Sequence, residues 1–356
     1  MGDFSADWLA LREPADRRAR DGHLVDLLRS YGARLSTGTA EDAGVGGVNR
    51  KPPAFITGPG GVEAATSVSP DADQSRRWPD DRALAGQLDP TRAVPCSPWR
   101  ILDLGCGTGS NLRYLAPRLG AAPVAMAWRQ QEWWCLDRDP RLLAELERRI
   151  PPTAAWASDL DLVVKTLRQD LARGGGSLLP LPLDARTLVT ASALLDLVSA
   201  DWLAGLLWAC AASASPLLLV LTYDGRVELS PAHPLDGTLV DLFNAHQRRD
   251  KGLGPALGPT APERLALLAD EWGFAREVSP SDWVLGPGDA ELVTALIEGW
   301  AAAAWEQAEG EPEAARLAVA IGSWREARLA QNASGWLRLR VGHQDALLLP
   351  ALRSDR

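Results

Sequence analysis

The chain has 356 residues, of which 46% are hydrophobic, and its formal net charge is −9. This length exceeds one average domain and fits a single large α/β domain with insertions, for which the apolar fraction provides a sizeable core. The acidic balance argues against non-specific binding to nucleic acid phosphates or anionic lipids, since that binding needs a basic face.

The four cysteines are scattered without a C-x-x-C pair, and the chain has only four histidines. We therefore expect no metal site. Free thiols suit a reducing compartment, and the first residues lack the apolar core of a signal peptide, so we expect a cytoplasmic protein. The uncharged run 202–223 contains Ser213, Ser215 and Pro216, which favours a helix end, a turn and a buried strand over a membrane span.

Residues 4–34 show the apolar spacing of helices and carry Arg12, Arg17, Arg18 and Arg20. These arginines are also consistent with a solvated helix face. Residues 36–99 are rich in Gly, Pro, Ser, Thr and Asp. This composition predicts a long loop or a disordered insertion, with room for a short helix over 82–88.

From residue 100 the sequence reads RILDLGCGTGSNLRY, which predicts a strand over 100–104, a glycine turn and a helix over 108–119. Glycines permit positive φ, and the free N–H groups at a helix start attract an anionic or polar ligand group. A dinucleotide fingerprint needs a glycine where Ser110 stands. The pattern is instead D-x-G-x-G-x-G, beginning at Asp103.

This stretch resembles the first motif of class I S-adenosylmethionine-dependent methyltransferases. The resemblance implies a doubly wound, mostly parallel seven-stranded sheet with an antiparallel last strand, and N-terminal helices over the cofactor as a lid. It also implies that the loop residues bind S-adenosyl-L-methionine; these are Asp103, Gly105, Cys106, Gly107, Thr108, Gly109 and Asn111. A nucleotide-binding or vestigial loop is the alternative.

The alternation of strands and helices that follows predicts a parallel sheet with crossover helices. A second strand over 132–136 ends at Asp137, after an extended loop over 118–131. The words CLDRDPRLLAEL resemble the second motif of the same family. The resemblance implies that Asp137, with Arg138 beside it, binds the ribose hydroxyls, while Asp139 caps the next helix.

A third strand over 162–168 leads to Asp170 and Leu171, which the resemblance places at the adenine; Asp184 is the competitor for this role. A fourth strand over 187–192 is expected to run directly into a helix, with Ser192 and Asp196 near the transferred methyl group. A fifth strand over 217–222 ends in Tyr223 and Asp224. Ligands of open α/β sheets bind beyond the carboxyl ends of the strands, so these ends face the site.

Residues 227–259 are the expected substrate-side insertion. They contain a dense polar cluster: Asn244, His246, Gln247, Arg248, Arg249, Asp250 and Lys251. Such a cluster is typical of a functional loop, and equally of a solvated helix C-terminus whose cations complement the helix dipole. The remaining chain predicts a helix over 261–272, a strand over 274–285, helices over 290–309 and 312–331, and a final strand over 335–341.

The sequence thus predicts a helical cap (1–35), the Gly/Pro-rich segment (36–99) and a methyltransferase domain (100–356). Methyl transfer is an in-line displacement for which the protein supplies alignment and a base. The candidates for a base are His246, Asp196 and Asp224, with Tyr223 shaping the pocket. We expect a small-molecule acceptor methylated at oxygen or nitrogen. An RNA or protein methyltransferase and a non-catalytic cofactor-binding regulator are the alternatives.

Overall fold

The computed structural model describes residues 4–37, 98–121, 125–150, 160–172, 183–309 and 312–350. The predicted short helix over 82–88 therefore lies outside the described residues, and so does the predicted loop 36–99 except at its two ends. The strands are β1 (Trp99–Leu104), β2 (Gln130–Asp137), β3 (Asp161–Arg168), β4 (Thr187–Ser192), β5 (Leu217–Ser230), β6 (Phe274–Pro280), β7 (Trp283–Leu285) and β8 (Arg338–Pro350).

The α-helices are α1 (Ala6–Ala19), α2 (Gly22–Thr37), α3 (Ser110–Leu119), α4 (Pro140–Arg149), α5 (Ala200–Ser213), α6 (Asp236–Gln247), α7 (Ala261–Trp272), α8 (Ala290–Ala308) and α9 (Ala314–Ala333). Short 3₁₀ turns are η4 (Ala125–Trp128), η6 (Leu195–Leu197), η7 (Gly258–Thr260) and η8 (Pro287–Asp289). Most predicted elements lie within two residues of these bounds.

The strands form one sheet in the order β3-β2-β1-β4-β5-β8-β6, and the short β7 also pairs with β8. The pairs from β3 to β5 are parallel, whereas β8 runs antiparallel to its neighbours β5, β6 and β7. The predicted doubly wound, mostly parallel sheet of class I methyltransferase type, with its antiparallel last strand, is confirmed. The topology brings the carboxyl ends of β1, β2 and β4 to one edge.

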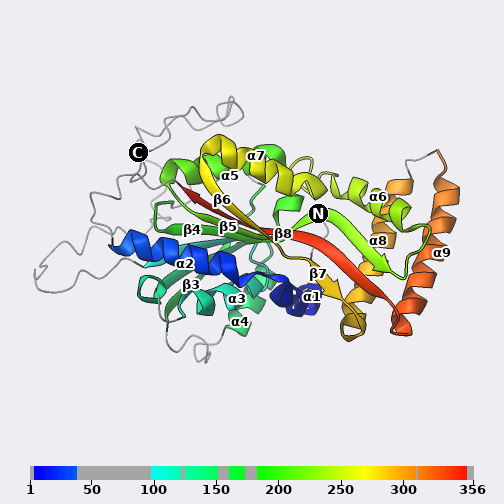
Figure 1. Cartoon of the computed structure of the whole chain (residues 1–356), viewed down its shortest axis with the longest axis horizontal. Helices are drawn as coiled ribbons and strands as arrows, with labels where there is room; N and C mark the ends of the chain where they lie inside the picture. The colour runs from blue at the N-terminus through cyan, green and yellow to red at the C-terminus, as the bar shows by residue number, and fades with distance from the viewer. Residues whose placement is uncertain are drawn as a thin grey trace, which may run out of the picture.

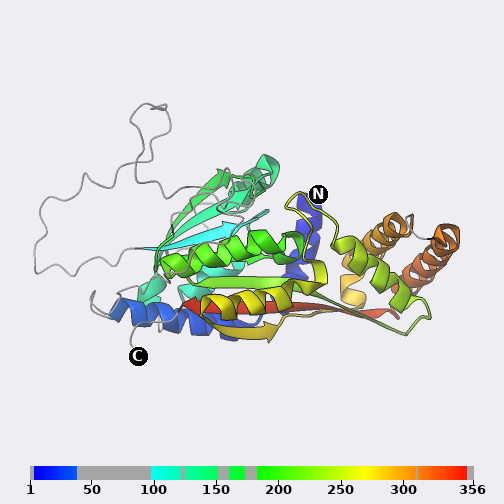
Figure 2. The same ribbon diagram turned by 90° about the horizontal axis from the view of Figure 1, so that it is seen from above.

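Helices cover both faces of this sheet (Figures 1 and 2). On one face, α5 and α7 pack leucines such as Leu203 and Leu265 against the strands. On the other face, α2 and α3 contribute Leu28, Leu112 and Leu115, with α4 beside them. This three-layer arrangement buries the apolar runs of β1 and β4, so the polar residues that follow these strands gather at the rim.

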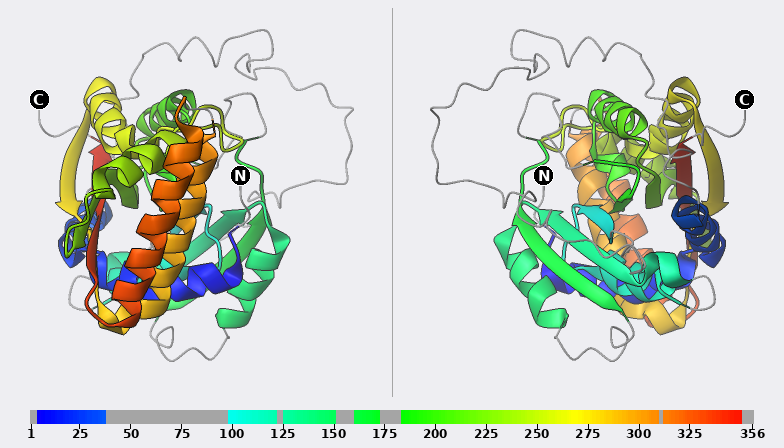
Figure 3. Two further views of the ribbon diagram at one scale, coloured as in Figure 1. Left: turned by 90° about the vertical axis from the view of Figure 1, so that its right-hand side faces the viewer. Right: turned by 90° about the vertical axis from the view of Figure 1, so that its left-hand side faces the viewer.

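A third core lies at one end of the molecule, where α6, α8 and α9 form what we call the helical appendage (Figure 3). The far halves of β5 and β8 extend from the central sheet to these helices. Within it, the fully buried Arg328 of α9 donates to both carboxylate oxygens of Asp236 on α6. In the chain, the two helices α8 and α9 lie between β7 and β8, as the sequence predicted.

The prediction of a continuous helix after β4 was wrong. The chain forms the turn η6, leaves helical geometry at Val198, and begins α5 only at Ala200. Ser199 is the cause, because its Oγ accepts a hydrogen bond from the backbone N–H of Trp202 at 3.2 Å and so caps a new helix. The run 202–223 is a helix, a turn and a strand, as predicted.

Three strand bounds also differ from the prediction. The expected strand 274–285 is two strands, because Ser281 leaves the ladder and donates its N–H to the carbonyl of His343. β5 continues to Ser230 and β8 to Pro350. The pairing of these two strands contains two register shifts, one on each side of Tyr223, and continues beyond them. Each strand is therefore longer than the apolar run from which the sequence predicted it.

Candidate functional site

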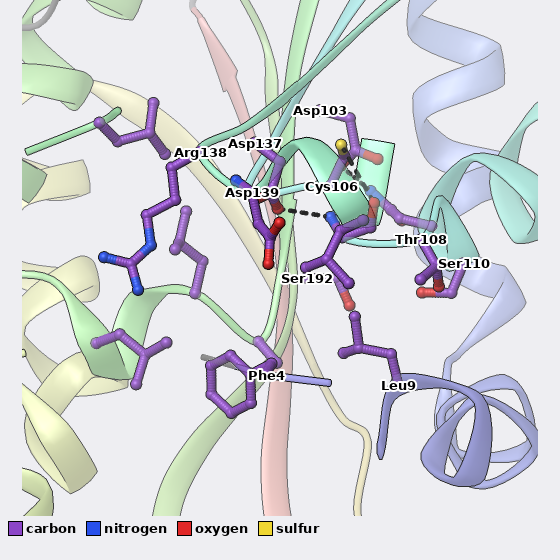
Figure 4. A pocket seen from close by; sticks show the side chains of 18 of the residues that line it. Phe4, Leu9, Asp103, Cys106, Thr108, Ser110, Asp137, Arg138, Asp139 and Ser192 are labelled. Atoms are coloured by element: carbon purple, nitrogen blue, oxygen red, sulfur yellow. Dashed lines mark hydrogen bonds between the residues drawn. The ribbon is translucent and has the colours of Figure 1, made fainter. Parts of the chain in front are cut away.

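A cavity lies at the carboxyl ends of β1, β2 and β4, between the glycine loop (residues 105–109) and α1 (Figure 4). It contains about 1170 Å³ of space without protein atoms, its open mouth included. The lining residues that the sequence predicted are Asp103, Gly105, Cys106, Gly107, Thr108, Asn111, Asp137, Arg138, Asp170, Leu171 and Ser192.

The glycine loop has the backbone that its composition predicts. Gly107 has φ +54° and Gly109 has φ +79°, in the left-handed region. A Cβ at Gly107 would lie 2.9 Å from Leu9 Cδ1 of α1, and one at Gly109 would lie 2.8 Å from Leu146 Cγ of α4. Gly107 therefore lets α1 approach the loop, whereas Gly109 faces α4 and does not line the cavity.

Asp137 closes the loop from the end of β2. Its Oδ2 accepts the backbone N–H of Gly107 at 2.9 Å, and its Oδ1 accepts that of Asp139 at 2.9 Å. Figure 4 shows this carboxylate inside the cavity beside the loop. Asp139 accepts the N–H of Arg141 at 2.8 Å and is the N-cap of α4. Asp139 thus caps α4, as the sequence predicted, and it lines the cavity beside Asp137.

A buried polar network forms the floor of the cavity. Asn111 donates to Asp103 Oδ1 at 2.8 Å and accepts from Arg20 Nη1 at 2.8 Å. Asp103 Oδ2, Thr108 Oγ1, and Nε and Nη2 of Arg20 have no hydrogen-bond partner. Burial raises the pKa of Asp103 to about 7 and lowers that of Arg20. Asp103 and Arg20, each with unused bonding capacity, are therefore joined through Asn111.

The two acidic candidates for the adenine end are separated by the fold. Asp170 and Leu171 follow β3 and line the cavity. Leu171 is fixed by its carbonyl, which accepts Trp202 Nε1 at 3.0 Å. Asp184 precedes β4, at the opposite edge of the sheet, where its Oδ1 accepts Thr187 Oγ1 at 2.7 Å. The structure brings only the first of these aspartates to the cavity.

Asp196 and Tyr223 lie behind the cavity wall. Asp196, in η6, is 9% exposed, its Oδ1 has no hydrogen-bond partner, and burial raises its pKa to about 6. Its neighbours Ala193, Leu194 and Leu197 line the cavity. Tyr223 donates to Asn244 Oδ1 at 2.8 Å, and burial raises its pKa.

Asp224 and His246 are not brought to the cavity. Asp224 pairs with Arg226 at 2.6 Å and lines a separate hollow beside α7. His246 Nε2 lies 2.9 Å from Glu306 Oε2 of α8, and burial lowers the pKa of the imidazole. Their predicted catalytic roles stay predictions, now without a contact to the cavity.

Helix α1 supplies the lining residues Leu9 and Asp16, which the sequence did not single out, together with Arg12, one of the four arginines noted above. Phe4, just before this helix, also lines the cavity. Three contacts hold the helix in place: Glu13 to Arg113 of α3 at 2.6 Å, Arg18 to Asp289 at 2.5 Å, and Asp16 to Trp283 Nε1 at 3.0 Å. No sequence signal marks these side chains, because their role depends on where the helix packs.

Gly252 and Leu253 line the mouth from the segment after α6. The carbonyl of Val198 accepts the N–H of Leu257 at 2.8 Å, so this segment is held against the start of α5. The expected substrate-side insertion thus reaches the cavity by its glycine-rich part. Asn244 and His246 do not line it.

Two non-glycine residues at the same rim have left-handed backbone: Ala193 after β4 (φ +52°) and Leu221 in β5 (φ +55°). They are held by hydrogen bonds, from Ala193 N to the carbonyl of Val220 at 2.9 Å and from Leu221 N to Asp345 Oδ1 at 2.8 Å. Backbone strain of this kind concentrates at functional sites. Here Ala193 directly follows β4 and lines the cavity, whereas Leu221 lies within β5.

Among the described residues, no group of three or more His, Cys, Asp or Glu side chains could hold a metal ion. In the same part of the chain, no helix has the length and apolar character needed to cross a membrane.

No protein-family model matches the chain. A 90-residue segment is 31% identical to trans-aconitate 2-methyltransferase of Methylobacterium nodulans, and it covers 25% of this chain and 31% of that protein. The match therefore spans only about a third of that relative.

Similar solved structures include cyclopropane synthase MmaA2 of Mycobacterium tuberculosis (12% identity, TM-score 0.34, covering 70% of this chain and 78% of that one). Another is a SAM-dependent methyltransferase of Geobacter sulfurreducens in complex with S-adenosyl-L-homocysteine (16% identity, TM-score 0.33, covering 71% and 85%).

Proposed function

We propose that this protein, whose sheet has the class I methyltransferase topology, is an S-adenosylmethionine-dependent methyltransferase acting on a small molecule. The observation that carries the proposal is the convergence of the glycine loop, Asp137 and Asp170 on one cavity, each at the end of a successive strand. The relative that matches the chain over 90 residues is, by its name, a trans-aconitate 2-methyltransferase, whose substrate is a small molecule. A cytoplasmic location is part of the same proposal.

The polar atoms of the cavity fit the three parts of this cofactor. Asp137 offers two acceptor oxygens to the ribose diol. Asp170 would accept from the adenine amino group, with Leu171 against the ring. Asp103 Oδ2 has no hydrogen-bond partner and matches the ammonium of the amino-acid end, and Thr108 Oγ1, also without a partner, can donate to its carboxylate. Ser192 and Arg138 complete the lining.

When bound, S-adenosylmethionine supplies an electrophilic methyl group on its sulfonium. The protein then has to align the acceptor, exclude water and take a proton if the acceptor carries one. We assign the proton-accepting role to Asp196, because its carboxyl is buried, its Oδ1 has no hydrogen-bond partner, and its neighbours Leu194 and Leu197 line the cavity. Tyr223 positions the neighbouring backbone through Asn244.

The finer assignment is a methyl acceptor with an oxygen nucleophile, and a nitrogen nucleophile is the second candidate. An RNA or protein methyltransferase is less favoured, because each N-terminal arginine either pairs with a carboxylate of the protein or is buried. Arg12 pairs with Asp16, Arg18 pairs with Asp289, and Arg20 is buried. A non-catalytic cofactor-binding regulator would share the cavity and differ only in turnover.

Two measurements test the proposal. Calorimetry with S-adenosylhomocysteine should show binding at one site, and binding should be lost or strongly weakened in Asp137→Ala. Transfer of label from methyl-labelled S-adenosylmethionine to a panel of small metabolites should then reveal turnover. Absence of binding would refute the cofactor site, whereas binding without turnover on any metabolite, RNA or protein acceptor would favour the regulator.

A further inference from the structure

We infer that the methyl acceptor is an uncharged molecule with an apolar body, selected by the ion pair of Arg12 and Asp16 at the cavity wall. This inference rests on the proposed methyltransferase function. It names the chemical class of the acceptor and the two residues that discriminate against charged competitors.

Arg12 and Asp16 form a closed pair on α1, and both side chains line the cavity. Arg12 Nε donates to Asp16 Oδ2 at 2.9 Å, and Arg12 Nη2 donates to Asp16 Oδ1 at 3.1 Å. The two side chains are only 12% and 10% exposed. A two-bond pair of this kind is strong and geometrically specific, and it adds no net charge to the cavity wall.

Trp283 of β7 fixes the pair in place. Its Nε1 donates to Asp16 Oδ1 at 3.0 Å, and the guanidinium of Arg12 lies over its ring, 5.1 Å from the centroid. In the sheet, β7 pairs with β8, and β8 is the neighbour of β5. The pair therefore lies towards the β5 side of the cavity, away from β2 and β3.

The other charged side chains of the cavity lie on the opposite side. They come from the ends of β1, β2 and β3, to which the proposed function assigns the cofactor; they are Asp103, Asp137, Arg138, Asp139 and Asp170. The sulfonium and ammonium of the cofactor oppose the negative charge of these aspartates. Among the described residues that line the cavity, only the balanced pair on α1 is left to meet a polar group of the acceptor.

The remaining wall is apolar. The segments after β4 and α6 contribute no polar side chain to it; they supply Ala193, Leu194, Leu197, Gly252 and Leu253. Phe4 and Leu9 add to this wall from the N-terminal segment, and Figure 4 shows them on the side of the cavity away from Asp103. An acceptor with an apolar body gains free energy by covering this surface.

A charged acceptor would lose its hydration at this wall without gaining an uncompensated partner. A carboxylate would meet Arg12 only beside Asp16, and an ammonium would meet Asp16 only beside Arg12. A neutral group avoids this cost. Nη1 of Arg12 has no hydrogen-bond partner in the described part of the chain, so it can donate to a carbonyl or hydroxyl oxygen.

The test uses the full chain saturated with S-adenosylhomocysteine, whose own binding is measured first. At pH 7 the complex is titrated calorimetrically with three phenols that differ in the charge of one substituent: 4-hydroxybenzamide, 4-hydroxybenzoate and 4-hydroxybenzylamine. We expect the uncharged amide to bind about tenfold or more tightly than either charged phenol, because a buried charge without a partner is costly. A charged phenol that binds as tightly as the amide, or no preference among the three, overturns the inference.

Two variants locate the preference by unbalancing the pair. Asp16→Asn leaves the charge of Arg12 and should shift the preference to 4-hydroxybenzoate. Arg12→Gln leaves the charge of Asp16 and should shift it to 4-hydroxybenzylamine. Asp289→Asn is the matched control, since it removes one charge from the pair with Arg18, which also holds α1 but does not line the cavity.

An unchanged preference in either pair variant that still binds S-adenosylhomocysteine overturns the role of the pair. Failure of S-adenosylhomocysteine to bind the unaltered chain would instead refute the proposed function, so the two failures are distinguishable.

Discussion

The backbone N–H of Gly107 donates to Asp137 Oδ2 at 2.9 Å, so the glycine loop is fastened to the end of β2. The same carboxylate also receives the N–H of Asp139. Each carboxylate oxygen keeps a second lone pair that can accept from a ligand. Asp137 therefore shapes the glycine loop and, in the proposed complex, holds the ribose.

Replacing Asp137 by Ala should weaken binding of S-adenosylhomocysteine by about ten- to hundredfold, because hydrogen bonds to a charged group contribute about 1.5–3 kcal/mol. Calorimetry measures the change. Asp184→Ala is the control, since it removes a carboxylate with local hydrogen bonds at the opposite edge of the sheet and should lower stability with a much smaller effect on affinity. Equal losses in both variants would contradict the ribose assignment.

Replacing Gly107 by Ala should lower the free energy of unfolding and also weaken cofactor binding. The left-handed backbone costs a non-glycine residue about 1–2 kcal/mol. The new Cβ would also meet Leu9 Cδ1 at 2.9 Å. Denaturant unfolding and calorimetry measure the two effects.

Two variants separate these causes. Adding Leu9→Ala to Gly107→Ala should relieve the contact and leave the backbone strain. Gly273→Ala, at the end of α7, has φ +76° and open space around it, so it should lose stability without losing cofactor affinity. An unchanged cofactor affinity in Gly107→Ala would show that α1 and the loop adjust without cost.

Turnover should depend on pH through Asp196. A base works in its deprotonated form, and burial raises the pKa of this carboxyl to about 6, so kcat/KM should rise from pH 5 to pH 7 and then level off. The positive charges of Arg12 and Lys251 oppose the effect of burial on the pKa of Asp196. Once a substrate is in hand, the pH profile of kcat/KM measures this.

Asp196→Asn should reduce turnover by about 10²–10⁴-fold and remove the inflection, with cofactor affinity retained. Asp224→Asn separates the two aspartates that the sequence proposed, because Asp224 lies outside the cavity. If the inflection follows Asp224 and persists in Asp196→Asn, the assignment of the base is wrong.

The helical appendage should depend on one buried ion pair. Arg328→Ala leaves the carboxylate of Asp236 without its partner, and breaking a buried pair costs about 3–5 kcal/mol. Denaturant unfolding measures the loss. Arg316→Ala, on the same helix α9, removes an exposed pair with Glu313 and should cost no more than about 1 kcal/mol. Similar losses in the two variants would show that burial does not strengthen the pair.

The sequence predicted the central sheet because its signals are local. Each buried strand is a short apolar run, and each run ends at a residue whose role depends on strand order, as with Asp137 and Asp170. The break before α5 could also have been read from Ser199, followed by Asp201 in the first turn. The apolar run on both sides of it obscured this cap signal.

The rest of the site depends on tertiary placement. Leu9 and Arg12 belong to an ordinary helical pattern, and only the packing of α1 brings them to the glycine loop. In the cluster after α6, residue types alone favoured His246. The partner on α8 decides the matter, because Glu306 binds His246 and keeps it away from the cavity. No pattern in one sequence shows which side of a segment a distant helix will cover.

The left-handed residues Ala193 and Leu221 bear on how this protein tolerates change. An L-residue in that conformation costs about 1–2 kcal/mol, so Ala193→Gly should make the fold more stable. At Leu221 the same gain would be outweighed, because that side chain is buried in the core. Ala193 lines the cavity, which implies a compromise in which the rim sacrifices stability for a fixed backbone. A stabilising substitution here is therefore expected to reduce turnover, and thermostable variants that keep activity should be sought in the appendage and on the outer helices.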